Sequence, residues 1–89
     1  MNARAKKTIA FAFGPFGRTG DRLFSVQGDM FAADATELAE LLLGVAIDLQ
    51  STIIAASPED DHTNLAYASR FMVDAARALY ISAGKGTET

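Results

Sequence analysis

Residues 32–56 carry the longest helical periodicity in the sequence, with apolar residues on two sides of the helix. At about 100° per residue, a broad apolar face and a narrower stripe are separated by polar residues. The face contains Leu38, Leu41, Leu42, Val45, Ala46, Leu49, Ile53 and Ala56, and the stripe contains Leu43, Ile47 and Ile54. A helix on the surface of a monomer normally has one apolar side. Two sides therefore predict two packing partners.

The first partner is a second helix of the same chain. Ser57-Pro58-Glu59-Asp60 has the residue types that begin a helix: an N-cap serine, a proline at the first position and acids in the first turn. This start places His62 in the first turns, where we expect it to be exposed. Gly84 is a suitable stop after about Ser82. The short connection predicts an antiparallel helical hairpin.

The start of the first helix has two candidates. Asp29 is positioned to cap a helix that begins near Met30, and Asp34 with Glu37 forms an Asp-x-x-Glu capping box. Either start places the helical hairpin within residues 29–84. Gly44, in the middle of the helix, is expected to allow close contact with a neighbouring element.

The second partner is predicted to be another copy of the chain. A chain of 89 residues without cysteine is a single domain whose small core has no disulfide to support it. Dimerisation is a common supplement, and we expect two hairpins to form a four-helix bundle. The candidate interface residues are either Leu43, Ile47 and Ile54 or Tyr67 and Phe71.

Residues 8–28 precede the helices as an extended aromatic arm or a short β-hairpin. Thr8–Phe13 alternates with a period of two, Gly14–Asp21 is a glycine-rich loop, and Arg22–Gln27 is a second extended segment. The arm carries Phe11, Phe13, Phe16 and Phe24. Aromatic side chains bury large areas, so we expect this arm to cover the alanine-rich helices. The alternative is an exposed aromatic patch that contacts a partner.

Charge divides the chain into a basic arm and an acidic body. Residues 1–22 carry a net charge of +4 and the remainder −7. The candidate anion contacts are Arg4, Lys6, Lys7, Arg18 and Arg22. The pI of about 4.9 and the absence of a basic helical stripe make nucleic acid an unfavoured partner. Residues 1–7 and 85–89 are predicted to be disordered tails.

The sequence contains few residues that are suited to catalysis or to binding a metal ion. His62 is the only histidine and there is no cysteine, so a transition-metal site lacks ligands and a catalytic triad lacks its context. Gly14, Gly17 and Gly20 recur without the lysine and following helix of a phosphate loop. We therefore predict a non-enzyme without a cofactor or metal.

The predicted location is the cytoplasm. No convincing signal-peptide cleavage site follows the N-terminal apolar run. Glu40, Gly44 and Asp48 interrupt the long helix, which argues against a membrane span.

Over residues 8–83 the sequence resembles a family of small bacterial proteins that is defined as a domain of unknown function. The resemblance is carried by Phe13-Gly14-Pro15-Phe16-Gly17, Leu23-Phe24-Ser25-Val26, Ala33-Asp34-Ala35, Leu38-Ala39-Glu40-Leu41-Leu42 and Ala75-Ala76-Arg77-Ala78-Leu79. Thr36 departs from the usual leucine, and Asp74–Arg77 replaces a methionine-containing run. The resemblance implies a small intracellular accessory protein and brings no activity.

Together these patterns predict a protein-interaction or regulatory module that self-associates and docks on a larger protein. Two alternatives remain. One is a binder of a small apolar ligand, with a pocket lined by Phe11, Phe13, Phe24 and Tyr67. The other is a nucleic-acid-binding regulator that uses the basic arm.

Overall fold

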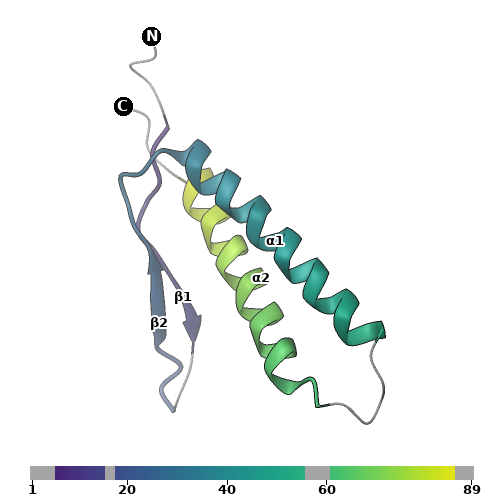
Figure 1. Ribbon diagram of the computed structural model, residues 1–89. Coiled ribbons are helices and arrows are strands. Elements are labelled where there is room, and N and C mark those ends of the chain that lie inside the picture. The colour runs from purple at the N-terminus through teal and green to yellow at the C-terminus, as the bar shows by residue number, and fades with distance from the viewer. Residues whose placement is uncertain (1–5, 16–17, 56–60, 86–89) are drawn as a thin grey trace.

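The computed structural model describes residues 6–15, 18–55 and 61–85 (Figure 1). Strands β1 (Phe11–Pro15) and β2 (Arg22–Val26) form an antiparallel hairpin, and helices α1 (Ala32–Ala55) and α2 (Thr63–Gly84) follow. The predicted helical hairpin preceded by a short β-hairpin is thus confirmed. The predicted helix start at Ser57-Pro58 lies outside the described residues. His62, predicted within the first turns, instead precedes α2 and is half-buried.

The elements lie side by side in one layer. The molecule measures 55 × 34 × 12 Å along its principal axes. Its smallest dimension is about the width of one helix with its side chains. In Figure 1 the β-hairpin lies against α2, and α1 lies on the other side of α2. Domains normally pack two layers around a core, so this chain has the shape of half such an arrangement.

The two helices meet through small side chains. The buried contact residues are Ala39 and Ala46 of α1 and Ser69, Ala76 and Ala83 of α2. Ser69 also accepts a hydrogen bond from Gln50 of α1, at 3.1 Å. We call this contact the alanine seam. Small residues let two helix backbones approach closely but bury little apolar area.

Only part of the broad apolar face of α1 contacts α2: Ala46 belongs to the alanine seam, whereas several of the larger side chains lie beside it. Leu38 is 47% exposed, Leu41 61% and Val45 37%. Gly44 also differs from the prediction, because the space around it is open rather than occupied by a neighbouring element.

Helix α1 begins at neither predicted position. Phe31 precedes its first residue, and the Phe31 carbonyl accepts hydrogen bonds from the N–H groups of Asp34 (3.1 Å) and Ala35 (3.3 Å). The N–H of Ala32 donates to the carbonyl of Lys6 at 2.9 Å. A backbone group distant in sequence thus satisfies one of the amides that a side-chain cap normally satisfies.

Residues 6–9 tie the start of α1 to the end of α2. The Thr8 hydroxyl donates to the Gln27 carbonyl (2.8 Å) and accepts from the Met30 N–H (3.1 Å). The Ile9 N–H donates to the Ser82 carbonyl, and the Ser82 hydroxyl donates to the Ile9 carbonyl. The base of the β-hairpin is thereby fixed by hydrogen bonds to both helical ends.

The tip of the β-hairpin is held by rings instead. Phe13 and Phe24 are cross-strand partners, and their ring centroids lie 6.1 and 5.0 Å from that of Phe71 on α2. Gly14 sits at φ 74°, and a Cβ there would lie 2.8 Å from the Phe24 ring. The strand therefore needs glycine at this position to keep Phe24 over Phe71.

The first turn of α2 is held by Asp61. One carboxylate oxygen accepts hydrogen bonds from the Thr63 hydroxyl (2.7 Å) and the Thr63 N–H (3.0 Å). These bonds favour the ionised carboxylate and lower the pKa of Asp61 below its ordinary value of 3.8. Because the folded-state pKa is the lower one, the stabilisation is complete above the unfolded value. It is lost as the pH falls through the folded value.

We expect Asp61→Ala to reduce the helical circular-dichroism signal slightly at neutral pH. The difference from the unsubstituted protein should disappear as the solution approaches about pH 2, where neither protein has an ionised carboxylate at position 61. Asp21→Ala, in an exposed loop, is the control. An Asp61→Ala deficit that persists unchanged in acid contradicts this assignment.

Candidate functional site

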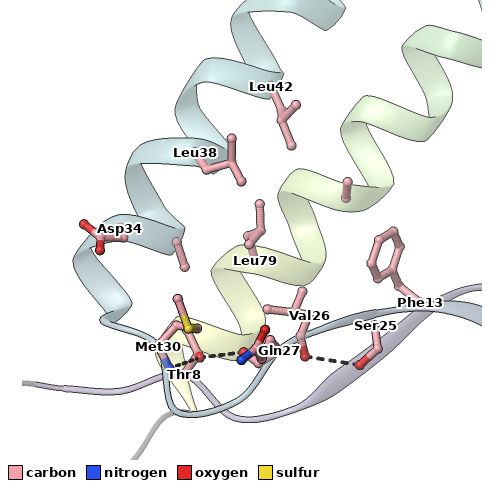
Figure 2. Close-up of a pocket in the computed structure, with 12 residues that line it drawn as sticks. Thr8, Phe13, Ser25, Val26, Gln27, Met30, Asp34, Leu38, Leu42 and Leu79 are labelled. Carbon is pink, nitrogen blue, oxygen red and sulfur yellow. Dashed lines mark hydrogen bonds between the residues drawn. The ribbon is translucent and has the colours of Figure 1, made fainter.

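The candidate site is an apolar groove of about 370 Å³ between the β-hairpin and the two helices. Figure 2 shows Leu38 and Leu42 from α1, Leu79 from α2, and Phe13 and Val26 from the hairpin around one space. Met30 and Thr8 lie at the end nearest the start of α1. The Thr8 hydroxyl is fully engaged with Gln27 and Met30. The groove therefore fits an apolar occupant.

The groove lies on one side of the molecule, which we call the groove face. It comprises Leu38, Leu41, Leu42 and Val45 of α1, Leu79 of α2 and Phe13 and Val26 of the hairpin. At about 100° per residue, Leu38 is about 90° from the centre of the alanine seam. All charged residues within α2, namely Arg70, Asp74 and Arg77, lie on the opposite side of that helix. The α2 part of the groove face is therefore uncharged.

The opposite side, which we call the back face, holds the narrow stripe of α1. Ile47 lies about 90° from the seam in the other direction and is 63% exposed, while Ile54 is 83% exposed. Val73, Tyr80 and the α2 charges occupy the same side. The back face is thus mixed, with apolar and charged residues interspersed.

The two alternative sets of predicted interface residues lie on different surfaces. Leu43, Ile47 and Ile54 lie on the back face, whereas Phe71 contacts Phe13 and Phe24 at the tip of the β-hairpin. Tyr67 projects from α2 away from α1 and is 72% exposed. The sequence stripe and the aromatic residues therefore belong to different sides of the layer.

The predicted ligand-binding phenylalanines are also divided. Phe13 lines the groove, whereas Phe11, on the same side of β1, does not. Phe24 and Tyr67 are not part of the groove wall. Phe16 lies outside the described residues. Sequence reasoning missed Leu79, in the last turns of α2, and Val26, the last residue of β2. The only sequence signal at these two positions is an apolar side chain.

The basic residues of the arm do not converge either. Lys6 donates to the Gly84 carbonyl at 3.0 Å, and the Lys7 ammonium lies 4.1 Å from the centroid of the Phe31 ring. Lys7 also pairs with Phe31 through a β-bridge. Both lysines, which the sequence assigned to a tail, thus hold the fold together. Arg18 is exposed, Arg22 faces α2, and Arg4 lies outside the described residues.

Within residues 6–15, 18–55 and 61–85, no group of three histidine, aspartate or glutamate side chains is arranged to hold a metal ion. By length and composition alone, α1 is apolar enough to cross a membrane, with a mean hydropathy of 1.6 over its most apolar window. The core helix of a soluble protein, which is mostly buried, and a signal sequence near the N-terminus pass the same test, and 11% of this window is buried. Comparisons with family models, curated proteins and solved structures found no match.

Proposed function

We propose that this protein is a non-enzymatic interaction module that acts by self-association. Two copies bury their groove faces against each other in a four-helix arrangement, and the assembly docks on a larger cytoplasmic protein. The observation that carries this proposal is the alanine seam. Each chain uses its smallest residues to join its helices and leaves Leu38, Leu41 and Val45 exposed.

The exposed area supports a second copy as the occupant. Leu38, Leu41 and Val45 are 47%, 61% and 37% exposed, and a second copy of the chain can bury these side chains against its own equivalents. Covering one face of the layer also restores the two-layer arrangement of ordinary domains.

Charge favours the groove face over the back face as the interface. Interface cores are depleted of charged residues. The α2 part of the groove face has none, and Asp34 of α1 is the one charged residue that lines the groove. Charge also favours a protein, rather than a lipid bilayer, as the partner that covers the groove face. Helices that lie in a membrane surface typically carry lysine and arginine on their polar side, whereas every charged residue of α1 is acidic.

We expect Leu38→Glu to weaken self-association by roughly 100- to 10,000-fold. Two-fold symmetry places the substitution twice in the interface, and each fully buried leucine contributes about 1.5–3 kcal/mol. The matched control is Ile47→Glu, the same charge change on the same helix but on the back face. Sedimentation equilibrium of the unsubstituted protein and both variants measures the dissociation constants.

Three results of this experiment lead to different conclusions. If Leu38→Glu weakens self-association and Ile47→Glu leaves it unchanged, the result supports the groove face as the interface. The reverse pattern places the interface on the stripe of Leu43, Ile47 and Ile54. An unsubstituted protein that stays monomeric at high micromolar concentration ends the self-association proposal.

A small apolar ligand is the second candidate, favoured by the groove itself. Its volume of about 370 Å³ falls at the lower end of ligand pockets, which span about 300–1,000 Å³. A ligand in the groove and a second copy on it compete for the same leucine side chains. The dependence on protein concentration in the sedimentation experiment separates them.

A further inference from the structure

A second cleft, of about 250 Å³, lies between β1 and α2 on the side away from the groove. Arg70, Asp74 and Arg77 line it from α2, and their spacing places them on one side of the helix. Arg22 joins them from β2, where it pairs with Pro15 of β1. Two distant parts of the sequence thus bring three guanidinium groups to one cleft.

These guanidinium groups are poorly neutralised. Asp74 is the only acidic residue in the lining, and it lies 3.6 Å from Arg70 in an exposed ion pair. In the described part of the chain, neither Arg22 nor Arg77 forms an ion pair. The cleft therefore carries an excess of two positive charges on a chain whose net charge is −3. Such local positive charge concentrates anions from solution.

The wall opposite the arginines is apolar. Phe11, Phe13 and Pro15 face the cleft from β1, because alternate residues of a strand point to the same side. Arginine binds carboxylate and phosphate through a planar fork of N–H donors, and rings pack against apolar or aromatic bodies. The volume is slightly below that of usual ligand pockets, so the ligand must be small.

We propose that this cleft binds a small amphiphilic anion: one carboxylate or phosphate group attached to an apolar body about the size of one ring. The anionic group lies among Arg22, Arg70 and Arg77, and the apolar body packs against Phe11 and Phe13. The site does not require self-association, because its arginines lie on the side of α2 away from Leu79 and the rest of the groove face. Phe13 is the one residue that lines both the groove and this cleft.

The test is an NMR titration of the whole protein with phenyl phosphate, benzoate, inorganic phosphate and benzyl alcohol. We expect saturable shifts of the arginine Nε–H signals and of amides in β1 with phenyl phosphate or benzoate, and the stronger of the two identifies the anionic group. Inorganic phosphate should bind at least tenfold more weakly, because it lacks the apolar body. Benzyl alcohol should produce no saturable shift.

Two variants make the titration specific. Arg77→Gln should weaken binding at least tenfold, whereas Arg18→Gln removes the same charge from an exposed loop outside the cleft and should leave binding unchanged. Circular dichroism confirms that both variants are folded. Equal weakening by both variants, equal binding of benzyl alcohol, or no saturable shift with either aromatic anion would overturn the proposal.

Discussion

Ala39→Leu is expected to destabilise the protein by about 1–3 kcal/mol, or more if the helices must separate. Ala39 is completely buried in the alanine seam. Leucine adds three heavy atoms where the two helix backbones approach closely, and a packed interior has no space for them. The added side chain therefore pushes α1 away from α2 along its whole length, and the loss is not limited to one contact.

Urea unfolding followed by circular dichroism, at one protein concentration, measures this effect. The matched control is Ala33→Leu on the same helix, where the residue is exposed. Its effect should be within about 0.5 kcal/mol of zero, as for most surface substitutions. If Ala39→Leu is as harmless as Ala33→Leu, then the seam is not packed as described.

Thr8→Val is expected to cost about 1–3 kcal/mol, although valine has nearly the same shape as threonine. The substitution removes the hydroxyl that bridges the Gln27 carbonyl and the Met30 N–H. Thr8 itself is 3% exposed, so its place in the structure is dry. Gln27 and Met30 are partly accessible, so water replaces some of the lost hydrogen bonding and limits the cost.

The control for this prediction is Thr52→Val on α1. The Thr52 hydroxyl donates to the Asp48 carbonyl at 3.1 Å, but on the exposed surface of the helix. Its removal should change the urea midpoint little. Equal midpoints for the Thr8 and Thr52 variants would mean that the bridge at the start of α1 adds nothing to stability.

Local patterns were sufficient to predict the elements. The alternation of Phe11 and Phe13 and the glycines after them indicate a hairpin, and helical periodicity indicates both helices. Which side of α1 faces α2 was not predictable in the same way. Leu38, Leu41 and Val45 are the more hydrophobic side, so sequence reasoning assigned them to the core of the chain. The structure instead uses alanines there, because close approach of the backbones depends on small residues on both helices at once.

The start of α1 and the arginine cleft were still harder to predict, because each is formed by residues that are distant in the sequence. The start of α1 is satisfied by the backbone of Lys6, which no side-chain signal announces. The spacing of Arg70, Asp74 and Arg77 is enough to place them on one side of α2. Their convergence with Arg22 depends on how β2 crosses the helix. The sequence groups Arg22 with the basic arm, because a sequence pattern shows only which residues are near each other along the chain.

The alanine seam has a consequence for how this protein responds to temperature. The heat-capacity change of unfolding follows the apolar area that unfolding exposes, and alanine and serine contribute little of it. Most of the large apolar side chains remain outside the seam. The partner that covers them therefore determines the heat-capacity change, and with it how strongly the free energy of unfolding curves with temperature. When that partner is a second copy of the chain, the melting temperature rises with protein concentration. A calorimetric heat-capacity change dominated by association would then mean that thermal stability belongs to the assembly rather than to the single chain.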